Sequence, residues 1–83
     1  MADDCKEDVL LRLRKIEGQI RGLQRMIDED TRCTEVIHQL CAARKALDKV
    51  GFIILSHRMQ ECLRQKGDSR SMDEAMELFL TLS

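Results

Sequence analysis

The chain has 83 residues, of which 43% are hydrophobic and 35% charged, and its formal net charge is -1. A chain this short forms one domain with a thin core, so self-association is an expected source of further burial. Because it contains no Pro, Trp or Tyr and only two Phe, the composition argues against a base-stacking surface for single-stranded nucleic acid and favours long helices. We expect no signal peptide and no membrane partner, hence a cytoplasmic protein whose four Cys are free thiols.

The first predicted element is an amphipathic helix from about residue 5 to about residue 28. Its apolar residues recur every three or four positions, which is the spacing of one helical face; they are Val9, Leu13, Ile16, Ile20, Leu23 and Ile27. Residues 1–6, including Cys5, are expected to be frayed. Three acidic residues at 28–30 end this helix, and Asp30 or Thr31 is the expected N-cap of the next one.

A second helix is predicted over roughly residues 32–66, about 50 Å long at 1.5 Å per residue. Its C-terminal half is apolar on nearly all sides, so it should be buried on more than one face. Gly51 would allow another helix to approach closely. A short third helix is predicted to begin at Ser71, where Glu74 would complete a capping box.

The predicted fold class is therefore all-α, with a long, a longer and a short helix in one domain covering residues 1–83. No single chain of this length can cover both faces of the second helix, so self-association should complete a helical bundle. The pattern lacks the short recognition helix of a helix-turn-helix, and no such motif is expected. It also lacks the acid–base constellation of an enzyme.

Two cysteines lie near opposite ends of the predicted second helix. Cys33 and Cys62 are 29 residues apart, or about 43 Å along one helix, so they cannot meet within a chain. In a symmetric antiparallel pair of these helices, a crossing between Leu47 and Asp48 places Cys33 of one copy against Cys62 of the other. The same register pairs Leu40 with position 55. The alternative is that both Cys are small buried hydrophobic residues.

Local features favour a reactive thiolate at these positions. Cys33 falls in the first turn of its helix, where backbone N–H groups and the helix dipole stabilise negative charge. Arg58 lies one turn before Cys62 and adds a positive charge on the same face. His57 is offset from Cys62 by about 140° around the helix, so it is a poor third metal ligand. Cys41 is expected in the core, and Cys5 is expected to be incidental.

Basic residues gather on the first helix and near the middle of the second: Arg12, Arg14, Lys15, Arg21, Arg44, Lys45 and Lys49. Duplicated by two-fold symmetry, they could form a continuous positive surface that neutralises phosphates. The alternative is a charged face that only solvates the bundle.

Two segments resemble the CsoR/RcnR/FrmR family of bacterial transcriptional repressors. They are RLRKIEGQIRG at residues 12–22 and QLCAARKALDKVG at residues 39–51, with Cys33 between them. The resemblance extends from about residue 8 to residue 82. It implies a three-helix subunit that forms antiparallel four-helix-bundle dimers, which pair into a homotetramer. It also implies binding to operator double-stranded DNA and release when an inducer reaches the second helix.

The resemblance assigns a sensing role to Cys33 and matches Cys62 to the second Cys of the copper-sensing and sulfur-sensing branches. Copper sensors add a His where this chain has Arg58. The formaldehyde branch has a His there too, with an N-terminal Pro where this chain has Ala2, and the nickel branch uses several His that are missing here. The pattern of this chain, Cys33 and Cys62 without that His, is most similar to the persulfide-sensing (CstR-like) branch.

The expected inducer is therefore a persulfide or polysulfide, with Cys33 and Cys62 as the sensing thiols, Arg58 supporting the thiolate, and no resident metal or cofactor. Cu(I) bound by the same two thiolates is the alternative. For DNA, the resemblance implicates Arg12 and Lys49 directly, with Arg14, Arg21 and Lys45 as supporting contacts.

Overall fold

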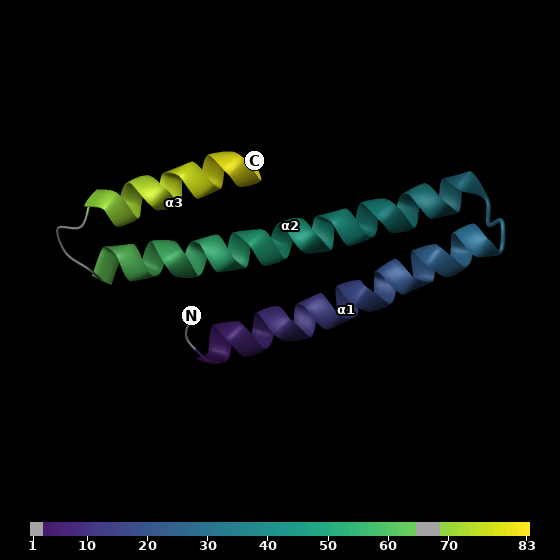
Figure 1. Cartoon of the computed structure of the whole chain (residues 1–83), viewed down its shortest axis with the longest axis horizontal. Helices are drawn as coiled ribbons and strands as arrows, with labels where there is room; N and C mark the ends of the chain where they lie inside the picture. The colour runs from purple at the N-terminus through teal and green to yellow at the C-terminus, as the bar shows by residue number, and fades with distance from the viewer. Residues whose placement is uncertain (1–2, 65–68) are drawn as a thin grey trace.

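The computed structural model describes residues 3–64 and 69–83, except for the side chains of residues 3, 62 and 69–71. Within these ranges the chain forms α1 (Asp3–Asp28), α2 (Cys33–Arg64) and α3 (Ser69–Leu82). The three helices lie side by side in one layer, with α2 between α1 and α3 (Figure 1). The layer measures 55 × 26 × 12 Å. The prediction of three unequal helices without strands is confirmed for the described part of the chain.

The start of α1 differs from the expectation of a frayed N-terminus. The helix begins at Asp3, and Cys5 is half-buried against a core cluster formed by Val9, Ile16 and Val50. Because Cys5 precedes Val9 by one turn, it lies on the same face and extends the apolar contact with α2. This contact joins the first turns of α1 to α2; residues 1–2 lie outside the described residues.

The turn between α1 and α2 is capped in a different way from the one predicted. Asp30 has a left-handed φ of 55°, the N–H of Thr31 donates to the carbonyl of Met26 at 2.9 Å, and that of Asp30 donates to Ile27 at 3.2 Å. These bonds form a Schellman motif that ends α1. The carbonyl of Arg32 accepts the first bonds of α2, so Arg32 occupies the N-cap position. The prediction of Asp30 or Thr31 as N-cap is wrong, because both residues terminate α1.

The helix α3 packs against the C-terminal half of α2. Its first residue is Ser69, two positions before the predicted start. The predicted capping box with Glu74 depends on the side chain of residue 71, which lies outside the described residues. Leu55 and Ala75 make a small core cluster. A Cβ placed on Gly51 would lie 2.8 Å from Cδ1 of Leu82, which confirms the close helix approach predicted there. The last two residues of the predicted second helix, 65–66, lie outside the described residues.

Much apolar surface is left uncovered on a single chain. Leu40, Leu47 and Ile54 are 50%, 46% and 38% exposed and recur every seven residues along α2. Leu55, by contrast, is only 5% exposed because α3 covers it. The predicted pairing of Leu40 with Leu55 of a second copy is therefore wrong. None of the helices, over its described residues, is long and apolar enough to cross a membrane.

Candidate thiol site and nucleic-acid interface

Cys33 is the first residue of α2, and its side chain is exposed. The backbone N–H groups of Glu35 and Val36 donate to Arg32 at 3.0 and 3.1 Å, which leaves the earlier N–H groups of this turn without a partner inside the helix. Glu35 adds a carboxylate in the same turn. The predicted position of Cys33 is confirmed, and the thiol is open to small reagents.

Cys62 lies on α2 near its other end, but its side chain falls outside the described residues. Continuous helix from Cys33 to Arg64 keeps the two cysteines of one chain about 43 Å apart along the axis. A contact between them requires a second copy, and that contact stays a prediction.

Arg58 is engaged by two carboxylates that the sequence analysis did not assign to it. Its Nη1 lies 3.3 Å from Oε2 of Glu61, and its Nη2 lies 3.1 Å from Oε2 of Glu74 on α3. Glu61 is three residues away on the same helix, a spacing that could have revealed the pair, whereas Glu74 is brought in by α3. The carboxylates offset part of the guanidinium charge, so support of the Cys62 thiolate by Arg58 stays a prediction.

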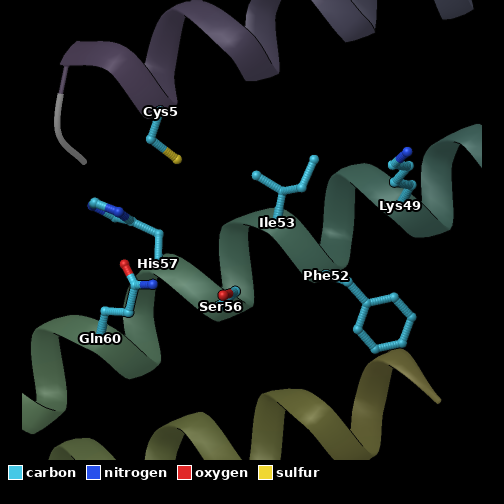
Figure 2. A pocket seen from close by; sticks show the side chains of 7 residues that line it. All are labelled: Cys5, Lys49, Phe52, Ile53, Ser56, His57 and Gln60. Atoms are coloured by element: carbon cyan, nitrogen blue, oxygen red, sulfur yellow. The ribbon is translucent and has the colours of Figure 1, made fainter.

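His57 also contacts Glu61, with 3.2 Å between Nε2 and Oε1, and its side chain is 18% exposed. It borders a cavity of about 370 Å³ lined by Cys5, Lys49, Phe52, Ile53, Ser56, His57 and Gln60. Figure 2 shows the Cys5 sulfur directed from α1 towards α2, on the side where His57 lies. From the sequence, Cys5 is expected to lie in a frayed N-terminus. The structure instead places it in the α1–α2 interface. Cys41 is half-buried and lines an apolar cavity with Leu23, Leu40 and Leu47. It belongs to neither core cluster of the single chain, so its expected core position is not confirmed.

The described side chains around the predicted thiol site offer few ligands for a metal ion. Among the described residues, no group of three His, Cys, Asp or Glu side chains converges to hold a metal ion. The place where a His would join Cys62 is taken by Arg58, whose guanidinium has donors but no lone pair for a metal. The two thiolates of Cys33 and Cys62 stay the predicted soft ligands on α2.

Two of the predicted DNA-binding residues meet at the α1–α2 interface. Arg12 and Lys49 line a cavity of about 240 Å³, together with Asp8, Leu11, Lys15, Ile16, Gln19 and Ala46. The Nε of Arg12 lies 3.2 Å from each carboxylate oxygen of Asp8. The structure therefore brings together charges from two helices that the sequence could only place on separate faces.

The other predicted DNA-binding residues lie apart from this cavity. Arg14 is exposed on α1, and Arg21 is exposed and paired with Glu17 at 3.7 Å. Lys45 is exposed one turn before Lys49 on α2. Lys15 and Gln19 line the cavity instead, at three and seven residues after Arg12. Lys15 was already named in the basic group of the sequence analysis, whereas Gln19 was not, and its helical spacing from Arg12 was the signal that could have found it.

Comparisons with known proteins all find metal-responsive transcriptional regulators. A family model described as metal-sensitive transcriptional repressor matches residues 5–81. The copper-sensing transcriptional repressor RicR of Mycobacterium tuberculosis is 40% identical over 58 residues, which cover 70% of this chain and 60% of RicR. The copper-sensing transcriptional repressor CsoR of Bacillus subtilis is 30% identical over 78 residues, covering 89% of this chain and 77% of CsoR. The solved structure of the nickel-responsive transcriptional regulator InrS is similar with a TM-score of 0.84 and 33% identity, covering 93% of this chain and 91% of InrS. The match to RicR thus spans less than two thirds of that protein.

Proposed function

The chain belongs to the CsoR/RcnR family of metal-sensitive transcriptional repressors, and from this premise we propose that it is an operator-binding repressor released by reactive sulfur species. Members of this family are transcriptional repressors, not enzymes. Residues 1–83 form one repressor domain, and persulfide or polysulfide acts on Cys33 of one subunit and Cys62 of its dimer partner.

The donor set at the sensing positions is the observation that carries this proposal. Cys33 offers an exposed thiol at a helix start, and Arg58, tied to Glu61 and Glu74, replaces a nitrogen ligand that would complete a three-coordinate copper site. A thiol needs no third ligand to react with sulfane sulfur. The site therefore fits covalent sulfur chemistry better than metal coordination.

The exposed seam of α2 supports the antiparallel dimer. A two-fold axis at Leu47 matches Leu40 of one copy with Ile54 of the other, and all three residues are exposed in the single chain. This register replaces the one centred between residues 47 and 48. It places Cys33 opposite position 61, next to Cys62 of the second copy. Dimers of this kind would pair further into a tetramer.

The sulfur chemistry proceeds in two substitutions. The Cys33 thiolate attacks the terminal sulfur of a persulfide R–S–SH; the S–S bond breaks, R–S⁻ leaves, and Cys33 becomes Cys33–S–SH. The Cys62 thiolate of the other subunit then attacks the inner sulfur, which forms a disulfide and releases HS⁻. If Cys62 is itself converted to a persulfide, attack by Cys33–S–S⁻ on its inner sulfur gives a trisulfide and HS⁻. A longer bridge tolerates Cα atoms farther apart than the roughly 4.4–6.8 Å of a simple disulfide.

Operator DNA is the proposed partner. Arg12 and Lys49 would contact phosphates from the α1–α2 interface, and Arg14, Arg21 and Lys45 would add contacts around them. Each phosphate contact replaces condensed counterions, so binding should weaken steeply as salt increases. Cross-linking α2 ends would bias the tetramer towards a form in which these basic surfaces no longer match the DNA.

A copper(I)-sensing repressor is the second candidate. The similarity to RicR and CsoR, both named as copper-sensing, favours it. Cysteine thiolates are soft ligands suited to Cu(I), and Cys33 with Cys62 of the second copy would supply two of them. When bound, the metal would join the same two helix ends as the sulfur bridge.

The deciding experiment measures release of a DNA duplex that the wild-type protein has enriched from random sequences. The full-length protein is titrated in parallel with polysulfide, Cu(I) and formaldehyde, and each sample is analysed by intact-mass spectrometry. We expect polysulfide to release DNA and to link subunits through a bond that a reductant cleaves. Cys33→Ser should abolish linkage, Cys62→Ser should leave at most an adduct on Cys33, and Cys41→Ser should behave as wild type. An unchanged mass with polysulfide, together with release by one Cu(I) per subunit, would establish the copper function instead.

A further inference from the structure

We infer that the cavity bordered by Arg12, Lys15, Gln19 and Lys49, called here the phosphate seat, receives one phosphate of the DNA backbone, and that Asp8 competes with this phosphate for Arg12. The inference rests on the proposed DNA-binding function and specifies one contact within it. The seat has a volume of about 240 Å³, several times the roughly 30 Å³ that one water occupies.

The charges that line the seat suit an oxyanion. Arg12, Lys15 and Gln19 lie on one face of α1 because they are separated by three and four residues, and Lys49 approaches from α2. Three cationic side chains thus face a single carboxylate, that of Asp8. A phosphodiester carries one negative charge on two free oxygens, which a guanidinium and ammonium groups can bind together.

Gln19 supplies the second observation. Its Oε1 is buried and has no hydrogen-bond partner among the described residues. An unpaired buried amide is unfavourable in the free protein. A half-turn of this amide exchanges its oxygen and nitrogen and presents an N–H₂ donor at the same place. Because Oε1 is out of reach of a water-sized group in the free protein, the Gln19 side chain must also rotate towards the seat before a phosphate oxygen can accept from its N–H₂ group.

Asp8 forms an ion pair with Arg12, the cation that would bind the phosphate. The Nε of Arg12 lies 3.2 Å from both Asp8 oxygens, and the side chains of Arg12 and Asp8 are 36% and 46% exposed. The pair is therefore open to solvent and to an incoming backbone. A phosphate and a carboxylate present similar oxygens to a guanidinium, so the phosphate can take the place of Asp8. The carboxylate lowers DNA affinity and eases release.

The test compares variants of the full chain that change charge equally at different places. Binding to a duplex enriched from random sequences by the wild-type protein is followed by fluorescence anisotropy between about 50 and 200 mM salt. Asp8→Asn should tighten binding by about two- to fivefold at the lower salt. Glu7→Gln removes a neighbouring carboxylate of α1 that does not line the seat, and its effect should be clearly smaller. Equal gains from Asp8→Asn and Glu7→Gln would overturn the inference.

Gln19→Leu separates function from stability. It removes a buried amide oxygen that has no partner among the described residues, so the Tm should be unchanged or higher, whereas DNA affinity should fall several-fold. Lys15→Ala should lower the slope of log affinity against log salt by about one, and Lys6→Ala, outside the seat, should lower it less. A Gln19→Leu variant that binds DNA as wild type does would contradict the seat.

Inorganic phosphate shares the chemistry of the backbone phosphate and serves as the second probe. Its titration into wild-type protein is followed through amide resonances of residues 8–19. We expect small shifts that saturate only at high phosphate and are enlarged by Asp8→Asn. Tight binding that blocks DNA would make the seat a site for free phosphate and overturn its assignment to the backbone. If Arg12→Ala and Lys49→Ala do not weaken DNA binding, the proposed DNA-binding surface itself is wrong. If they do, while Asp8→Asn matches Glu7→Gln and Gln19→Leu binds DNA as wild type does, only this inference fails.

Discussion

Arg58 on α2 and Glu74 on α3 are sixteen residues apart in sequence, yet Nη2 of the first lies 3.1 Å from Oε2 of the second. This pair joins α3 to the end of α2 that also contains Cys62. A residue expected to act on the sensing thiol is thereby tied to the packing of the third helix. Movement of α3 would change the charge available near Cys62.

Replacing Glu74 should reveal this coupling. Glu74→Gln removes one of the two carboxylates on Arg58, so the Cys62 thiol should react faster with an alkylating reagent, measured by mass spectrometry in a Cys33→Ser background. The cost in unfolding free energy should be below about 1 kcal/mol because the ion pair is exposed to solvent. Glu77→Gln, on the same helix, is the control. Equal labelling rates in both variants would show that Arg58 does not support the thiolate.

Gly51 tests the packing of α3. Gly51→Ala gains helix propensity of about 1 kcal/mol, but its Cβ would lie 2.8 Å from Cδ1 of Leu82 and must displace the end of that side chain. The gain and the cost should offset each other, so the Tm should change little. Gly51→Leu would displace Leu82 and should lower the Tm by several degrees. Thermal unfolding followed by circular dichroism separates the two cases. If Leu is tolerated as well as Ala, the close approach of α3 is not maintained in solution.

The exposed seam of α2 should control self-association. Leu47 lies at the centre of the proposed two-fold contact, so Leu47→Asp would bring two carboxylates together in an apolar interface and should dissociate the oligomer. Light scattering at micromolar concentration measures the mass of wild type and variant. Leu63→Asp, at another exposed apolar position of α2, is the comparison. A wild-type protein that is already monomeric would contradict the dimer and, with it, the Cys33–Cys62 pairing.

The proposed DNA contacts should respond to salt. Arg12→Ala and Lys49→Ala should each weaken operator binding and lower the salt slope by about one, since each removes one phosphate contact. Arg21→Ala should cost less, because Arg21 lies outside the cavity that Arg12 and Lys49 line. Circular dichroism of each variant checks that the helices remain. Unchanged affinity and slope for both Arg12→Ala and Lys49→Ala would exclude this surface as the DNA contact.

The sequence by itself determined the helices and the position of Cys33 at the start of α2. Spacings of three and four residues, such as those from Val9 to Ile16, depend only on the local geometry of a helix. The two sequence segments that contain Arg12 and Lys49 also pointed to the repressor family before any contact was known. Local signals failed at the turn, where Asp30 adopts a left-handed φ that ends α1 instead of beginning α2.

Only the tertiary structure decided which side chains meet across helices. Cys5 reaches a cavity beside His57, and Lys49 joins Lys15 and Gln19. Glu74 on α3 binds Arg58 on α2. Each contact depends on the rotation and axial offset of one helix against another, and these are set by how the cores around Val50 and Leu55 pack. A pattern along a single helix specifies which face is apolar, but many offsets bury that face equally well, so the partners of its polar residues follow only from the packed structure.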